Sequence, residues 1–197
     1  MNLRVVIAAS LIAAMMQADA LESLPTGWSK MPGSGADNMP GSCAVGIDAD
    51  LAAAGQPNMS IDCPGDEAGF GGVRQAFEAS PYWGKRVRFS AWIMVEGAND
   101  IDGYEAGGGL WIGVPSPEGP MYNRMEERAL KGYTSWEYRD FVVDIPEGGQ
   151  FINIGFWLGG QGQLWIRDLE FEVVPGSVPV NLSYEQDEAL GPNLNLE

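Results

Sequence analysis

The sequence predicts an all-β protein, a sandwich of two antiparallel sheets of the jelly-roll type. Apolar residues alternate with polar ones in short runs, and signals for helices are weak. The chain contains 27 glycines and 13 prolines, which interrupt these runs repeatedly. Short, regularly spaced strands separated by turn residues are typical of sandwiches and barrels. Eight such runs suit a jelly roll made of two sheets.

The strands follow from the alternation itself. The expected strands span residues 44–48, 59–63, 72–78, 86–96, 109–114, 138–145, 151–158 and 163–174. The segment MYNRMEERALKG, residues 121–132, has the best helical composition in the chain. Its apolar spacing is irregular, so a turn or an extended segment fits it equally well.

The first twenty residues have the three parts of a secretory signal peptide. Arg4 supplies the basic region, residues 5–16 are apolar, and residues 18–20 form a small-x-small cleavage site. The apolar run is shorter than the roughly 20 residues that span a bilayer, and no later segment is a better candidate. We therefore expect an exported protein, periplasmic or secreted, that does not insert into a membrane.

The rest of the chain fits one domain followed by a tail. Residues 21–174 have the length of a single sandwich domain. Residues 175–197 lose the alternation and gain proline and acidic residues. This composition is typical of a tail that lies on the surface or has no fixed structure.

Charge and composition exclude several classes of function. The net charge is −16, and removing the signal peptide leaves it unchanged because Arg4 and Asp19 are lost together. A nucleic acid is therefore not expected as a partner, since phosphate contacts require clustered Lys and Arg. The chain has no histidine, which rules out Ser-His-Asp and Cys-His catalysis and removes the commonest zinc ligand.

The two cysteines, Cys43 and Cys63, predict a disulfide in an exported protein. If the two flanking segments pair antiparallel with residue numbers that add to 106, Cys43 faces Cys63. The same register aligns two apolar pairs, Val45 with Ile61 and Ile47 with Met59. One pairing thus explains both the cysteines and the apolar residues around them.

Three tryptophans occupy the polar side of their strands. Successive side chains of a strand point to opposite faces, and in each strand the apolar set leaves a tryptophan on the other side. These tryptophans are Trp92, Trp111 and Trp157. The polar residues expected beside them are Arg88, Asn153 and Tyr138. Trp165 has the parity of Leu169 and Phe171, so we expect it in the core.

An aromatic face with polar neighbours is suited to a carbohydrate or a similar small polar ligand. The C–H face of a sugar stacks on flat rings while its hydroxyls bind polar side chains. The alternative is that these tryptophans pack under a loop or in the core, since tryptophan is usually mostly buried. Glycines 107–109, 113 and 155 would leave open space beside the rings.

Several motifs resemble those of a known group of domains. They are QAFEASPYWGKRVRFSAWI, LKGYTSWEYRDFVVDIP and INIGFWLGGQGQLWIRDLEFEVV, with LESLPTGW at the start. Residues 21–174 with these motifs resemble jelly-roll domains of the carbohydrate-binding-module or galactose-binding type in bacterial secreted proteins. The same pattern is similar to a domain appended to some bacterial transcription regulators and exported peptidases. The resemblance implies the fold, whereas the ligand varies among such domains.

The resemblance also implies a structural calcium at Asp168, because related modules hold calcium near this position. Calcium binds six to eight oxygens, so Asp168 alone does not make a site, and no other cofactor is expected.

Three functions remain open from the sequence. The first is a non-catalytic module that binds a carbohydrate or small polar ligand. The second is a structural or interaction module of the cell envelope without a small ligand. The third is a glycan hydrolase or lyase, which needs converging carboxylates such as Asp102 with Glu105 or Glu126 with Glu127.

Overall fold

A computed structural model describes residues 21–31, 41–49, 51, 58–65, 68–101 and 105–181. The predicted signal peptide and residues 182–197 of the predicted tail lie outside the described residues. Within the described part of the chain, no helix has the length and apolar character needed to cross a bilayer.

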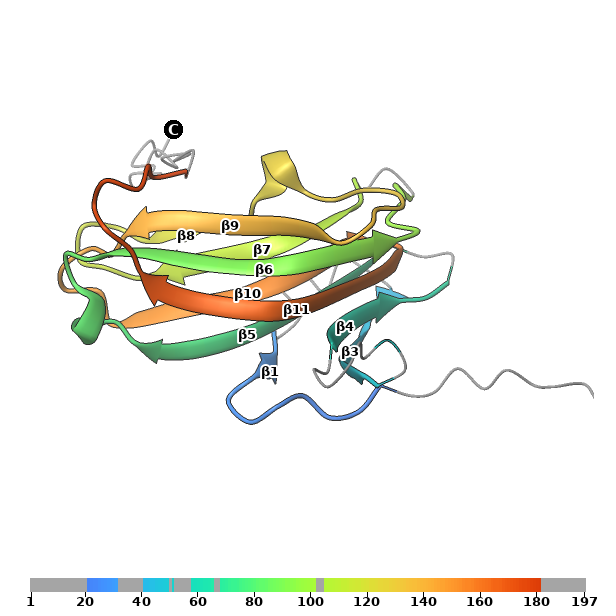
Figure 1. Cartoon of the computed structure of the whole chain (residues 1–197). Helices are drawn as coiled ribbons and strands as arrows, with labels where there is room; N and C mark the ends of the chain where they lie inside the picture. Colours follow the sequence, from blue (N-terminus) through green and yellow to red (C-terminus); the bar gives the residue numbers. More distant parts are fainter. Residues whose placement is uncertain are drawn as a thin grey trace, which may run out of the picture.

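The protein is a sandwich of two stacked sheets (Figure 1). The strands are β1 (Ser29–Lys30), β2 (Gly41–Ser42), β3 (Ala44–Asp48), β4 (Asn58–Cys63), β5 (Gly69–Glu78), β6 (Arg86–Glu96), β7 (Gly107–Val114), β8 (Met121–Asn123), β9 (Glu137–Asp144), β10 (Phe151–Gly160) and β11 (Gly162–Val173). One sheet, here called the β10 sheet, has the order β1-β5-β10-β7-β8, with β2 paired to β5. The other, the β6 sheet, has the order β3-β4-β11-β6-β9.

The predicted fold class is confirmed. Each of the eight expected strands is present, and the largest shift is at the start of β5, which begins at Gly69. All described strand pairs are antiparallel except β2 with β5. The missed strands β1, β2 and β8 are too short to show alternation. The helical candidate is instead β8, a single 3-10 turn η2 (Glu126–Arg128) and extended chain.

The core lies between the sheets and is built by alternation. The inward side chains of β6 are fully buried, and those of β10 are at most 4% exposed. The inward residues of β6 are Val87, Phe89, Ala91, Ile93 and Val95, and those of β10 are Ile152, Ile154, Phe156 and Leu158. Their outward neighbours are therefore presented on the two outer surfaces of the sandwich.

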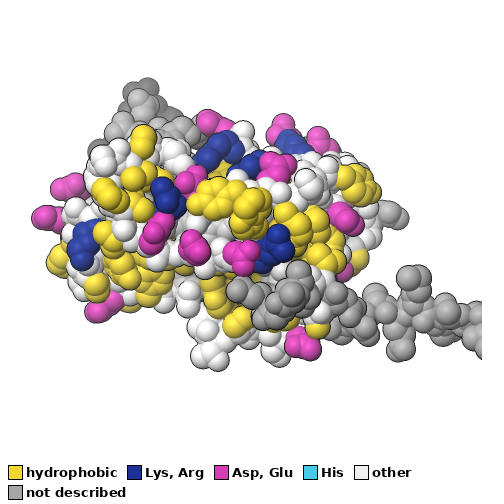
Figure 2. Space-filling view, viewed as in Figure 1, with side chains coloured by type: hydrophobic (Ala, Val, Ile, Leu, Met, Phe, Trp, Pro, Cys, Tyr) yellow, Lys and Arg dark blue, Asp and Glu magenta, His cyan; other side chains and the backbone are white. Residues whose placement is uncertain are grey.

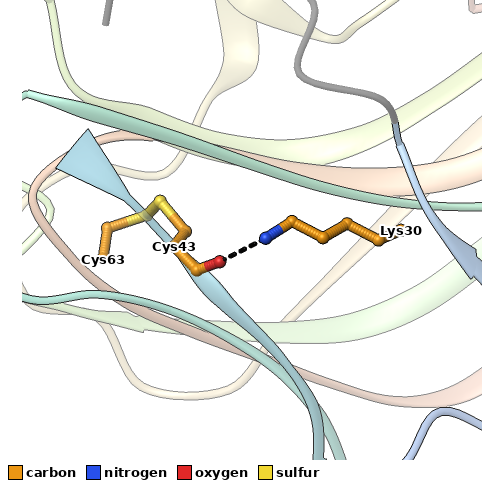
Figure 3. The surroundings of a disulfide bond; sticks show 3 residues. All are labelled: Lys30, Cys43 and Cys63. Atoms are coloured by element: carbon orange, nitrogen blue, oxygen red, sulfur yellow. Dashed lines mark hydrogen bonds between the residues drawn. A yellow bond between two sulfur atoms is a disulfide. The ribbon is translucent and has the colours of Figure 1, made fainter. Parts of the chain in front are cut away.

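The disulfide and its register are confirmed. Cys43 and Cys63 are bonded, 20 residues apart, and β3 pairs with β4 in the predicted register, with Val45 opposite Ile61. Lys30 of β1 donates a hydrogen bond of 2.7 Å to the Cys43 carbonyl oxygen (Figure 3). The bridge lies directly against β5, because a Cβ added to Gly71 would stand 2.9 Å from the Cys43 Cβ. It therefore ties the edge of the β6 sheet to the β10 sheet.

The chain after β11 is held on the surface of the β6 sheet. Arg86 binds both carboxylate oxygens of Asp144 at 2.7 Å and also donates to the carbonyl oxygens of Gly176 and Val178. Asn181 then pairs with the backbone of Val142 on the outer edge of β9. The first residues of the predicted tail, up to residue 181, thus cover the β9 edge, which otherwise offers unpaired backbone groups.

Removing the disulfide should destabilise the protein without changing the fold. A Cys43→Ala, Cys63→Ala double variant loses the constraint on a loop of 20 residues, which the chain-entropy model values at about 3 kcal/mol. Urea unfolding of the oxidised protein, the reduced protein and the variant measures this loss. Equal stability of all three would contradict the structural role of the bridge.

Acid should remove the stabilisation that the ion pair between Arg86 and Asp144 provides. The hydrogen bonds from Arg86 hold the pKa of Asp144 below its ordinary value. The stabilisation is therefore present above the unfolded carboxyl pKa of about 4 and is lost as pH falls through the lower folded pKa. Because the pair is exposed, we expect at most about 1 kcal/mol. Unfolding free energy from pH 6 to pH 2.5 should depend less on pH in Asp144→Asn than in the wild type, and an identical dependence would refute this contribution.

Candidate functional site

The six predicted ligand-binding residues lie on two different surfaces. Those of the β6 sheet are Trp92, Arg88 and Tyr138. Those of the β10 sheet are Trp111, Trp157 and Asn153. Each tryptophan points away from the core between the sheets, as the alternation in its strand predicted. The outer surfaces of the two sheets are on opposite sides of the sandwich, so the prediction of one shared aromatic platform is wrong.

The physical reason is that alternation is a local property. It fixes which side of a strand faces the interior, but it does not say to which sheet the strand belongs. Sheet membership depends on long-range pairing: β6 pairs with β9 and β11, whereas β10 pairs with β5 and β7.

On the β10 sheet the tryptophans are sealed from solvent. Trp111 is 5% exposed and Trp157 is 8% exposed. The Trp111 ring lies against Gly155 of the neighbouring strand, and its Nε1 donates to the Val73 carbonyl oxygen at 3.3 Å. The glycines that suggested open space beside the rings instead let an indole lie flat on the backbone.

The segment around β8 and η2 closes the face over Trp157. The Trp157 Nε1 donates to the Arg124 carbonyl oxygen at 2.6 Å, and the Arg124 guanidinium lies 5.9 Å from the centre of its ring. Phe70 stacks near it with a centroid distance of 6.5 Å. Met125 is buried over Gly109 with a left-handed φ of 59°, and the Asn123 side chain accepts its backbone N–H. The packing alternative is the correct description of this face.

The remaining polar groups of this face serve the sheet. Asn153 donates to the Gly113 carbonyl oxygen of β7 at 3.4 Å. Tyr122 contacts Trp111 with a centroid distance of 6.0 Å, and burial raises the pKa of its hydroxyl. Tyr122 is 50% exposed, but the Trp111 ring that it contacts is buried, so the two do not form an open aromatic pair.

Trp165 is buried, but it does not belong to the inner core. Its Nε1 donates to the Asp48 carboxylate at 2.7 Å on the outer surface of β3. β11 contains a bulge between Arg167 and Glu170, which shifts the register against β6. Residues on the two sides of the bulge therefore do not share parity, so the predicted grouping of Trp165 with Phe171 is wrong.

The β6 sheet carries exposed aromatic rings. Trp92 is 39% exposed and Tyr138, its direct partner on β9, is 46% exposed. Their rings meet edge to face with a centroid distance of 5.8 Å. Next to Trp92 on β11 is Arg167, whose guanidinium lies 4.3 Å from the centre of the Trp136 ring. We call these four residues the Trp92 platform.

Charged side chains surround the Trp92 platform in fixed positions. Arg88 binds Glu172 at 2.9 Å and lies 3.6 Å from Asp140, and Arg139 binds Glu137 at 2.7 Å. The side chains whose buried Nε has no hydrogen-bond partner are Arg88, Arg139 and Arg167. Figure 2 shows hydrophobic, basic and acidic side chains interspersed over β6, β9 and β11.

A polar groove opens beside the Trp92 platform. It has a volume of about 400 Å³ and is lined by Arg128, Ala129, Tyr138, Arg139 and Asp140. Arg128, from η2, donates to the Asp140 carbonyl oxygen at 3.3 Å. Tyr138 belongs to both features, so a ligand lying on the rings reaches the groove without a gap.

Sequence reasoning missed Trp136, Arg167, Arg128 and Arg139. Trp136 and Arg128 lie outside the long strands, so alternation assigned them no face. The pairing of β6 with β9 was nevertheless detectable, because residue numbers that add to 230 align Phe89 with Phe141.

The other predicted site residues are Asp168 and the carboxylate pairs. Asp168 has a left-handed φ of 51° and its carboxylate lies 3.7 Å from Arg167. Across the described residues, no group of three or more His, Cys, Asp or Glu side chains comes together to hold a metal. Calcium at Asp168 thus gains no support. Of the carboxylate pairs, Asp102 is outside the described residues, Glu105 pairs with Lys131, and Glu126 pairs with Arg124.

Comparisons with known proteins agree with the fold. The xylan-binding domain CBM22-1 of Xyn10C from Paenibacillus barcinonensis has a TM-score of 0.51 and 12% identity, covering 79% of this chain and 91% of that domain. Another xylan-binding domain of CBM 22 gives the same score with 13% identity, over 79% of this chain and 92% of that one. An enzymatically active domain of tailspike protein 4 from bacteriophage CBA120 also has a TM-score of 0.51, with 11% identity, over 76% of this chain and 20% of that chain.

A sequence relative links the chain to a regulator. This chain is 32% identical over 134 residues to the uncharacterized HTH-type transcriptional regulator YbfP of Bacillus subtilis (strain 168). The match covers 60% of this chain. This chain spans only 43% of that relative's length, and no family model matches the sequence. The resemblance to jelly-roll domains of the carbohydrate-binding type is therefore confirmed as a likeness of fold, and the link to regulators as a likeness in sequence.

Close contact between Trp111 and Gly155 predicts a sharp difference between two glycine substitutions. In Gly155→Ala the new Cβ would stand 2.0 Å from the Val73 carbonyl oxygen and 2.4 Å from the Trp111 Nε1, so overpacking should cost about 2 kcal/mol. In the control, Gly109→Ala, the nearest atom is 3.6 Å away and stability should change by less than about 0.5 kcal/mol. Chemical unfolding monitored by fluorescence measures both, and equal effects would show that position 155 has room for a side chain beside Val73 and Trp111.

Proposed function

We propose that this protein is an exported, non-catalytic module that binds a carbohydrate or similar polar ligand on the Trp92 platform. The observation that carries the proposal is the exposure of Trp92 and Tyr138 in one edge-to-face pair beside a polar groove. Export is supported by the signal-like N-terminal sequence. The fold shared with xylan-binding domains supports a binding role and suggests xylan oligosaccharides as the first ligands to try.

The chemistry of the platform suits a sugar chain. The exposed face of the Trp92 ring offers a flat apolar surface, and Tyr138 restrains the ring from the side. Guanidinium and carboxylate groups around it supply donors and acceptors for hydroxyls. Because these charges are already paired in the free protein, binding does not require them to become ordered, which limits the entropic cost.

Binding should be of moderate strength. One or two stacked rings contribute about 1 kcal/mol each beyond the burial of area, which corresponds to micromolar affinity rather than nanomolar. The ion pairs of the carboxylates beside the platform, Glu172 with Arg88 and Glu137 with Arg139, suit binding rather than bond cleavage.

A protein partner is the second candidate for the same surface. Trp92 and Tyr138 are both exposed, and exposed aromatic patches often mark protein contacts. The likeness to a regulator supports this alternative, since an appended domain can contact other parts of its own chain. It predicts no response to any glycan and a loss of association when Trp92 is removed.

Calorimetric titration with a panel of soluble glycans that includes xylohexaose tests the proposal. The wild type should bind one member with micromolar affinity, and Trp92→Ala should weaken that binding at least tenfold, about 1.4 kcal/mol. Trp83→Ala is the matched control, because Trp83 is also exposed but hydrogen-bonds the Gly149 carbonyl oxygen away from the platform. Binding that survives Trp92→Ala unchanged, or no heat with any glycan, would rule out the proposed site.

A further inference from the structure

A second pocket lies inside the sandwich, between the sheets, and it shares only Arg167 with the Trp92 platform. Its volume is about 380 Å³, within the range of small-molecule sites. It is located where β4 stops: β4 pairs with β11 only as far as Met59 and Ile166. Beyond that point, β11 continues with no strand paired to it on that side among the described residues.

The bulge in β11 lines this pocket. The register against β6 shifts between Arg167 and Glu170, and Asp168 takes a left-handed φ of 51° within the shift. Only a few per cent of non-glycine residues adopt this conformation, and such positions concentrate at functional sites. The residues of the shift, Arg167 to Glu170, line the pocket together with Phe171.

The walls of the pocket are mostly aromatic and aliphatic. They include Trp28, Phe89, Phe171, Met59, Ile154 and Leu169. Phe171 is held in place by edge contacts with Phe77 at 5.0 Å and Tyr82 at 5.2 Å. Trp28 is fixed against Phe156, with a centroid distance of 6.2 Å. Rings that are held in this way form a preformed apolar slot.

The Gln75 side chain lines the slot from the inner side of the β10 sheet. Gln75 lies opposite Ile154 in β10 and has the inward parity of Val73. Its side-chain amide makes no hydrogen bond to any other described residue. Asp168 and Glu170 lie at the rim. An apolar inner wall with a few polar groups, here the Gln75 amide and the charged residues Arg167, Asp168 and Glu170, is the usual composition of a small-ligand site.

We infer that this pocket binds a small planar molecule of one or two aromatic rings that carries one hydroxyl or N–H group. The rings fit between Trp28 and Phe171, and the polar group meets the Gln75 amide. A sugar is a poor fit, because the aromatic and aliphatic side chains of the inner wall would bury its hydroxyls without hydrogen-bond partners. The inference does not depend on the proposed function, which uses the outer surface of the β6 sheet.

Ligand-observed NMR with 2-naphthol as the probe tests the inference. The wild type should bind it saturably with a dissociation constant on the order of 100 µM, as expected for a ligand of this size. Gln75→Leu keeps the side-chain volume but removes the amide, and should weaken binding about fivefold. Leu169→Trp fills the pocket and should abolish binding, whereas Trp92→Ala should bind like the wild type.

The variants are first compared by circular dichroism to establish that they fold. If Leu169→Trp does not fold, the comparison of Gln75→Leu with Trp92→Ala still decides the question. Absence of saturable binding to the wild type, or equal binding by Gln75→Leu and the wild type, overturns the inference. Loss of 2-naphthol binding in Trp92→Ala also overturns it, because the probe would then lie on the platform.

Discussion

The burial of alternate side chains between two sheets is the constraint on which the rest of the structure depends. The inward residues of β6 and β10 are buried between the sheets, so the residues between them in each strand face an outer surface. Two sheets give two such surfaces, and they carry different chemistry. The disulfide between Cys43 and Cys63 joins the paired strands β3 and β4 and packs on β5, so it holds one edge of the β6 sheet in place.

The two outer surfaces differ in what covers them. On the β10 sheet, glycines let Trp111 lie on the backbone, and the segment from β8 to η2 closes over Trp157. On the β6 sheet, Trp92 and Tyr138 remain open to solvent. The presence of tryptophans alone therefore does not identify a binding surface. What distinguishes the two surfaces is whether another segment covers the rings. The exposed pair and its paired charges make the β6 sheet the surface suited to a polar ligand.

Much of the fold could be predicted because its signals are local. Alternation located eight strands, and the matching apolar pairs beside Cys43 and Cys63 gave the register of β3 with β4. The candidate site was predicted only in part, since Trp92, Arg88 and Tyr138 are together but Trp111, Trp157 and Asn153 are on the opposite side. Sheet membership arises from pairings between distant segments, and the bulge at Asp168 breaks the parity that grouped Trp165 with Phe171. Neither effect leaves a local pattern in the sequence.

The most direct test of the account follows the indole N–H signals of the protein by NMR during titration with xylohexaose or another glycan that binds. Each tryptophan has one indole N–H group, so the signals that shift show which surface contacts the ligand. The account predicts that the Trp92 signal shifts with the ligand while those of Trp111 and Trp157 stay in place. Shifts of Trp111 and Trp157 with an unchanged Trp92 would contradict it.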